Sequence, residues 1–442
     1  MLRKVIDSLT LGILLATHLS TALADELVFA EVYAIARSAA PELAMAKYRV
    51  DGAEAEKDIA TRRLFPQLRL FGQYSENSVK YDDNLFYGDQ SYPGKRYGLQ
   101  VSQPLLNVPD GIEARRMGLI YDQSVEELAV AEGQLLSQLL EAYLQVLLAD
   151  TELEQFQTEL KALESQLSEA EALYQRNLIP VTQVLETKSR TEALRADVIR
   201  AQGDAAIARE MLIQLTGQRG IEPLPVRDSF NFISRYASAE AAGEAALDND
   251  PAIAAAETAL TAAKSAIDRE RGSWIPEIDI TYSYQHSDVG FDNLSSPPRD
   301  TSTLAIGFNY PLFEGGAKSA RIRAAWAEYY SAKTVLEAQQ RESEARARAA
   351  WLNLEAISRR LVAARQSTQT TEVSVDASRK AVKAGTARVT DVLIALAQNT
   401  SAQRDLSSAK FQFAMGWVEL ELATGGIPQS IVPAVSAALH GR

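Results

Sequence analysis

Residues 389–393 read Val-Thr-Asp-Val-Leu and residues 181–185 read Val-Thr-Gln-Val-Leu, so one short pattern occurs twice, 208 positions apart. Nearer the N-terminus, Pro66 is matched by Pro276, at a separation of 210 positions. Two nearly constant separations along one chain are typical of an internal duplication. The sequence therefore predicts two copies of one unit, joined end to end.

The duplication divides the chain into five predicted parts. They are a signal peptide at 1–24, a first repeat at 25–217, a linker at 218–240, a second repeat at 241–425 and a C-terminal tail at 426–442. Each repeat is expected to read helix, two strands, long helix, helix.

The N-terminus has the pattern of an export signal. Arg3 and Lys4 precede an apolar run at 9–15, and Ala22-Leu23-Ala24 provides a small-residue cleavage site. No apolar run of 18 residues follows, so the sequence predicts no membrane-spanning α-helix after the signal.

The composition excludes much chemistry. The chain has 442 residues, a formal net charge of -13, no cysteine and three histidines. Disulfides, cysteine nucleophiles and thiolate metal sites are therefore impossible, and most zinc sites are excluded. His286 and His440 are predicted to be solvated loop residues rather than general bases. We expect no enzyme activity, no cofactor and no metal site, and the acidic charge argues against nucleic acid as a partner.

Long helices are predicted in both repeats. Residues 27–62 and 251–271 have helical spacing, and no proline interrupts the stretches from Pro109 to Pro180 and from Pro311 to Pro428. A helix over 112–175 would span about 95 Å at 1.5 Å per residue. A break near Asn177 or Gly385 precedes a second helix of about 35 residues, so each repeat carries a long antiparallel hairpin.

The remaining segments alternate like strands. Ile278, Ile280 and Tyr282 alternate with Asp279 and Thr281, which predicts a strand with one apolar and one polar face. Alternation with clustered tyrosines is typical of outer-membrane strands, although an amphipathic sheet on a soluble core has the same pattern. Four strands cannot close a barrel, so the membrane interpretation requires a dimer with about eight strands or a trimer with about 12. The loops at 79–95 and 286–301 would then face outside the cell.

Two other classes of protein remain open at this point. A periplasmic coiled-coil scaffold without channel activity would explain the helices but leaves the alternating strands unexplained. A glycosidase using Glu277 and Asp279 as a carboxylate pair is a second alternative. Carboxylates on one strand face are more simply groups that line a polar lumen.

The ordered set of motifs resembles the TolC-type outer membrane efflux proteins. Its carriers are 181–185, 389–393, Pro104-Leu105-Leu106 and the segment 311–316, which reads Pro-Leu-Phe-Glu-Gly-Gly. The resemblance implies a mostly helical homotrimer in which twelve strands cross the outer membrane of a Gram-negative bacterium and twelve helical columns form a tunnel in the periplasm. It also implies a passive exit duct for an inner-membrane RND pump or a type I secretion ABC exporter, joined through a periplasmic adaptor protein. The cargo is not indicated.

The resemblance further implies a periplasmic entrance at the hairpin tips. Asp391 matches an acidic position at this entrance, Gln183 occupies the equivalent place in the first repeat, and Arg388 is a candidate for ionic contacts that close it. Three copies of Asp391 would favour cations, although Ile394 stands where relatives carry a second acidic residue. As an alternative, Asp391 is a first-turn residue favoured by the helix dipole.

The adaptor is expected to contact the two turns. Asn177 and Leu178 stand at the first turn, and Gly385 and Thr386 stand at the second, which is closer to the family pattern. Ordinary helix capping by the same residues is compatible with this role.

Overall fold

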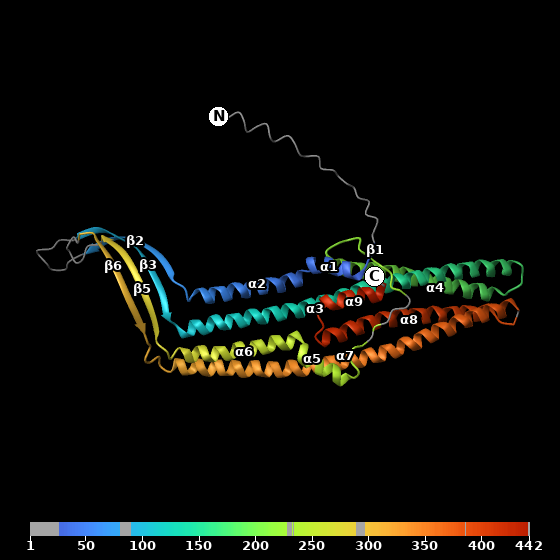
Figure 1. The fold of residues 1–442 in the computed structure, drawn as a ribbon. Helices are drawn as coiled ribbons and strands as arrows, with labels where there is room; N and C mark the ends of the chain where they lie inside the picture. The colour runs from blue at the N-terminus through green and yellow to red at the C-terminus, as the bar shows by residue number, and fades with distance from the viewer. Residues whose placement is uncertain are drawn as a thin grey trace, which may run out of the picture.

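The computed structural model describes residues 26–79, 90–227, 232, 234–288, 297–384 and 386–440. The predicted signal peptide, the central parts of both predicted surface loops and Gly385 lie outside the described residues. A sheet forms one end of the molecule, and long helices run from it to the opposite end (Figure 1).

The elements repeat in the predicted order, which confirms the internal duplication. The first copy has α1 (Phe29–Ala39), α2 (Pro41–Arg62), β2 (Gln67–Val79), β3 (Gln90–Leu106), α3 (Val108–Gln175) and α4 (Val181–Thr216). The second has α5 (Ala239–Asn249), α6 (Pro251–Gly272), β5 (Glu277–Asp288), β6 (Arg299–Asn309), α7 (Ala317–Lys383) and α8 (Val389–Ala423). Outside this pattern lie β1 (Glu26–Leu27), β4 (Glu222–Pro223) and α9 (Pro428–His440).

The prediction of one helix over 27–62 was wrong. Ala40 has φ -63° and ψ 119°, an extended conformation that ends α1 before α2 begins at Pro41. The proline ring disfavours helical geometry in the residue before it. The second copy breaks in the same way at Asp250, whose side chain accepts a hydrogen bond of 2.9 Å from the Ala252 nitrogen at the start of α6.

Four strands form one antiparallel sheet in the order β2-β3-β5-β6. The strands are longer than predicted, so β3 already begins at Gln90 and β5 continues through His286 to Asp288. His286 is thus a strand residue rather than the expected loop residue, and its Nδ1 lies 2.8 Å from the Asp300 carboxylate. One face exposes large apolar side chains, among which are Leu68, Leu70, Tyr74, Tyr97, Tyr282, Tyr284, Leu304, Ile306 and Phe308.

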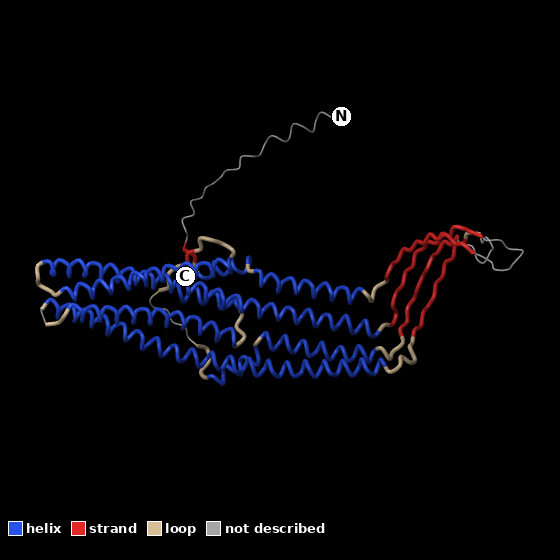
Figure 2. Tube along the Cα trace, turned by 180° about the vertical axis from the view of Figure 1, so that it is seen from behind, coloured by secondary structure: helices blue, strands red, loops and turns tan. Residues whose placement is uncertain are grey.

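Next to the sheet, four helices form a single layer. α2 contacts α3, α3 contacts α6 and α6 contacts α7, so α2 and α7 are the edges of this layer (Figure 2). Farther from the sheet, α3 pairs with α4 and α7 pairs with α8, which confirms the two predicted helical hairpins. No helix in the described part of the chain is long and apolar enough to cross a membrane.

The main core lies midway along the molecule, where α1, α5 and α9 surround the long helices (Figure 1). Helix α3 contributes fully buried Leu136, Leu139 and Tyr143 to this core. His440, predicted to be solvated, is buried instead, because α9 packs against α3 and places His440 Nε2 at 3.2 Å from the Tyr143 hydroxyl.

Candidate functional site

The first hairpin ends in a left-handed turn at Asn177. Its φ is 57°, and among the described non-glycine residues it is the one with positive φ. The Asn177 nitrogen donates to Tyr174 O at 2.8 Å and the Leu178 nitrogen donates to Leu173 O at 3.0 Å. These two bonds form a Schellman motif, which satisfies the last carbonyl groups of α3. The predicted C-capping conformation of Asn177 is therefore confirmed, and the Leu178 side chain is exposed.

The second hairpin tip resembles the first in its backbone bonds. The Thr386 nitrogen donates to Ala381 O at 3.0 Å, and the Thr386 hydroxyl donates to the same oxygen at 3.0 Å. Gly385, between these residues, lies outside the described residues. Both turns therefore provide backbone N–H donors to carbonyl groups at the end of a long helix, which would otherwise be unpaired.

Asp391 caps the start of α8. Its Oδ2 accepts a hydrogen bond of 2.9 Å from the backbone nitrogen of Arg388, which is the N-cap residue. A carboxylate in the first turn also interacts favourably with the positive end of the helix dipole. Asp391 is thus bonded to the Arg388 backbone, and within the described residues it forms no ion pair with a guanidinium group.

A cavity of about 280 Å³ lies between the two hairpin tips. Gln183 of α4 and Arg388 both line it, so the structure brings these two predicted residues together. Asn177, Leu178, Thr386 and Asp391 are not among its described lining residues. The sequence interpretation missed Glu169 of α3 and Arg379 of α7, which also line the cavity.

The hairpins are joined just beyond this cavity. Arg190 of α4 donates from Nη2 to the backbone oxygen of Leu393 in α8, at 3.0 Å. Leu393 is itself buried in a small apolar cluster with Leu163 and Leu194. This contact connects the first repeat with the second near the tips.

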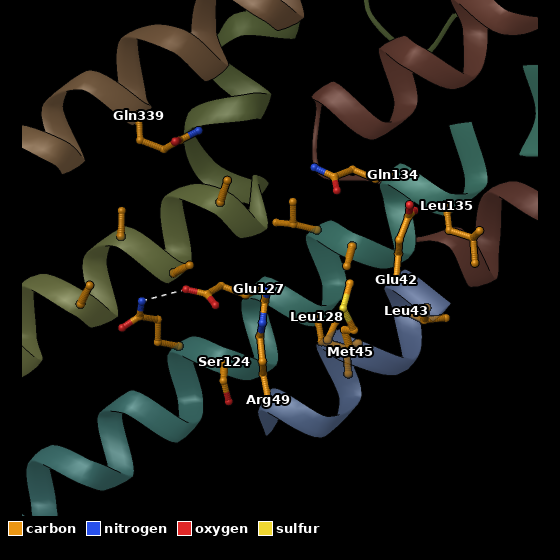
Figure 3. Close-up of a pocket in the computed structure, with 18 of the residues that line it drawn as sticks. Glu42, Leu43, Met45, Arg49, Ser124, Glu127, Leu128, Gln134, Leu135 and Gln339 are labelled. Atoms are coloured by element: carbon orange, nitrogen blue, oxygen red, sulfur yellow. Dashed lines mark hydrogen bonds between the residues drawn. The ribbon is translucent and has the colours of Figure 1, made fainter. Parts of the chain in front are cut away.

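A second, larger hollow of about 690 Å³ lies nearer the sheet, between α2, α3, α6 and α7. Figure 3 shows Met45 and Arg49 of α2, Glu127 of α3 and Gln339 of α7 around it, with Gln123 bonded to Glu127 at 2.8 Å. Its lining mixes apolar, polar and charged groups. Nowhere in the described ranges do three or more His, Asp or Glu side chains gather in a way that would hold a metal ion.

A network of ion pairs connects the helices just below the sheet. Glu113 of α3 bonds Arg116 at 2.7 Å and Arg269 of α6 at 2.9 Å. The hydrogen bond from Arg116, with a further one from Arg269, lowers the pKa of the Glu113 carboxyl to about 2. The network continues from Glu270 through Arg321 to Glu314, which lies in the predicted 311–316 motif. It anchors the helical layer to the strand end of the molecule.

A sheet with one exposed apolar face, prolonged by a single layer of very long helices, defines a class of protein: the channels that cross the outer membrane and extend into the periplasm. Residues 32–218 and 242–426 match the family described as Outer membrane efflux protein, one match for each repeat. The chain belongs to this family.

Relatives of known name cover most of the chain. The Outer membrane protein TolC of Vibrio cholerae is 24% identical over 419 residues, covering 93% of each chain. The Alkaline protease secretion protein AprF of Pseudomonas aeruginosa is 25% identical over 360 residues, covering 80% of this chain and 74% of AprF. The CmeC outer membrane channel of Campylobacter jejuni shares the fold, with a TM-score of 0.80, 16% identity, and coverage of 94% of this chain and 90% of CmeC.

The protein is therefore an outer-membrane exit duct, and the larger part of its length lies in the periplasm. Its family consists of transport channels rather than enzymes.

Proposed function

We propose that three copies of the chain close into one duct, which carries cargo from an inner-membrane transporter through a periplasmic adaptor to the outside of the cell. The observation that carries this proposal is the open sheet. Strand β2 and strand β6 are the ends of the order β2-β3-β5-β6, so each leaves a row of backbone groups unpaired in a single chain. In lipid, every such group requires a partner.

The two open edges differ, which favours a head-to-tail ring of copies. Pairing β6 of one copy with β2 of the next is a head-to-tail contact, which closes into a ring when the rotation permits. Three copies supply about 12 strands, above the minimum of about eight for a barrel. The exposed apolar face of the sheet then contacts lipid, and the alternate side chains line the lumen.

The helical layer supports the same ring. Its edge helices expose large apolar side chains that a neighbouring copy would cover. On α2 these are Met45, Tyr48 and Ile59, and on α7 they are Tyr330, Val335, Leu352, Val362 and Val373. On α4, the edge helix of the first hairpin, they are Ile199, Ile207 and Met211.

The hairpin tips form the periplasmic entrance in this proposal. Asp391, Arg388 and Gln183 surround the entrance, and Asn177, Leu178, Gly385 and Thr386 form the turns that the adaptor contacts. Support comes from the cavity that Gln183 and Arg388 share and from the exposure of the Leu178 side chain at a rigidly capped turn. The names of the relatives mention protease secretion and efflux, which supports either an ABC exporter or an efflux pump as the transporter in this proposal.

Two measurements test the proposal. The mass of the detergent-solubilised oligomer should equal three chains, and the purified oligomer should form small channels in planar bilayers. The adaptor contact can be tested by single-cysteine crosslinking, which is specific here because the chain has no native cysteine. Leu178→Cys should crosslink to a periplasmic adaptor, and Glu54→Cys, at an exposed position of α2 near the sheet, should not. A monomeric or dimeric mass, or crosslinking equal at both sites, contradicts the proposal.

A further inference from the structure

The two hairpin tips carry opposite charge, although they are copies of one unit. Residues 168–183 contain two acidic residues and one basic residue, and the equivalent residues 376–391 contain two acidic and four basic residues. The basic residues of the second tip are Arg379, Lys380, Lys383 and Arg388. The second tip is therefore net positive where the first is net negative.

Two of these basic residues face the space between the hairpins. Arg379 and Arg388 line the cavity of about 280 Å³, and both side chains are exposed. Neither guanidinium group forms an ion pair with any of the described residues. Glu169 is the one acidic residue among the described lining residues, and it also has no ion-pair partner there.

Asp391 cannot by itself offset these charges, because it carries one negative charge against the two guanidinium groups of Arg379 and Arg388. Its Oδ2 accepts a hydrogen bond from the backbone nitrogen of Arg388, and no guanidinium group of the described residues pairs with it. In the proposed trimer, a ring of Asp391 side chains stands beside a ring of Arg388 side chains, with Arg379 adding further positive charge.

Helix capping explains only part of this pattern. Basic residues near a helix C-terminus are favoured by the dipole, which accounts for Arg379, Lys380 and Lys383 at the end of α7. Arg388 is different, because it is the N-cap of α8, at the positive end of that helix. A cation is disfavoured there, and the position normally holds Ser, Thr, Asp or Asn. Local helix stability therefore gives no reason for Arg388.

We propose that Arg379 and Arg388 make the periplasmic entrance prefer anionic solutes. This rests on the proposed trimeric duct, in which three copies place six guanidinium groups around the entrance. Charges act over about 8 Å at physiological ionic strength, and rings of Arg or Lys favour anions in pores. The preference is opposite to that expected from Asp391 alone, and it assigns this duct to cargo with exposed carboxylate or phosphate groups.

The test is the reversal potential of single channels in a potassium chloride gradient. In the double variant Arg379→Gln/Arg388→Gln, the ratio of chloride to potassium permeability should fall by roughly twofold or more, because the local potential loses its positive source. Glu169→Gln should raise the same ratio. The control Arg341→Gln/Arg365→Gln removes equal charge from α7 several turns away and should shift the ratio less.

The outcomes separate the two proposals. If the ratio of chloride to potassium permeability is unchanged in both the double variant and Glu169→Gln, the role proposed for the arginines is wrong. The proposed duct is not affected by that result. A control that shifts the ratio as much as the tip variant also overturns it. If no preparation forms channels, the duct itself fails, and the inference fails with it.

Discussion

Glu113 of α3 and Arg269 of α6 lie 2.9 Å apart and join the first repeat to the second just below the sheet. The two residues are 156 positions apart in the chain, so the contact exists only when both repeats are folded against each other. Glu113 is also bonded to Arg116, and its side chain is nearly buried. The pair therefore marks the point where the helical layer and the sheet are held in one arrangement.

Acid should weaken this junction. The folded-state pKa of Glu113 is about 2, below its ordinary value of 4.5, so the carboxylate stabilises the fold fully above pH 4.5. That stabilisation, on the order of 2 kcal/mol after solvent screening, is lost as pH falls from about 5 towards 2. Glu113→Gln should lower the unfolding midpoint at pH 7 and should lose less stability than the wild type on acidification to pH 3.

Circular dichroism of the thermal transition at both pH values measures this effect. Glu56→Gln is a matched control, because Glu56 is an exposed residue of α2 for which no ion pair is present among the described residues. The control should behave like the wild type at both pH values. Equal pH dependence in Glu113→Gln and the wild type would show that the Glu113 carboxylate does not stabilise the junction.

The capping role of Asp391 can be separated from its charge. Asp391→Asn keeps an oxygen that accepts from the Arg388 nitrogen but removes the charge, and Asp391→Ala removes both. Loss of a cap costs about 0.5–2 kcal/mol. We expect Asp391→Ala to loosen the start of α8 and to raise the single-channel conductance, with Asp391→Asn close to the wild type. If the two variants are equally altered, the charge rather than the cap controls the entrance.

The first turn should depend on the backbone of Asn177. Its φ of 57° costs most residues that carry a Cβ about 1–2 kcal/mol. Glycine has no Cβ, and asparagine is one of the few other residues that adopt this conformation readily. Asn177→Gly should therefore keep the turn and the adaptor crosslink from Leu178→Cys, whereas Asn177→Ala should weaken the crosslink. Crosslinking yields in these two backgrounds are the measurement. Equal yields would show that the adaptor does not depend on the geometry of this turn.

Local patterns predicted most of the fold. The hairpins and strands follow from helical spacing, period-two alternation and the placement of proline, all of which are visible over ten residues or so. The Asn177 turn was predictable for the same reason. The break at Ala40 was missed although Pro41 was visible, because the helical composition continues across it and only the effect of proline on the preceding residue reveals it.

The features that the sequence did not predict depend on contacts between residues far apart in the chain. His440 is buried because α9 docks beside Tyr143, 297 positions away, and no local pattern encodes that contact. The tip cavity likewise forms between two hairpins that are distant in the chain, so Arg379 carried no motif that would have identified it. The sequence feature that could have indicated Arg379 is the charge difference between the two hairpin tips. That difference is informative only when the two tips are known to lie side by side.

The proposed contact between the apolar face of the sheet and lipid leads to a prediction about assembly. Leu304 lies at the middle of β6, is paired with Tyr282 of β5 and is 69% exposed in a single chain. Thr303, the preceding residue, points to the opposite face of the sheet. In the proposed duct Leu304 contacts lipid near the bilayer midplane, and Thr303 faces the lumen.

Arginine at these two neighbouring positions should therefore have opposite consequences. On the lipid face at the midplane it costs about 2–4 kcal/mol per chain, and a trimer carries this cost three times. Leu304→Arg should abolish the trimer in the outer-membrane fraction, whereas Thr303→Arg should assemble normally and alter only conductance. Because both variants add the same side chain to the same edge strand, a general effect on folding would affect them equally. Loss of assembly in both, or in neither, would contradict the assignment of the two faces.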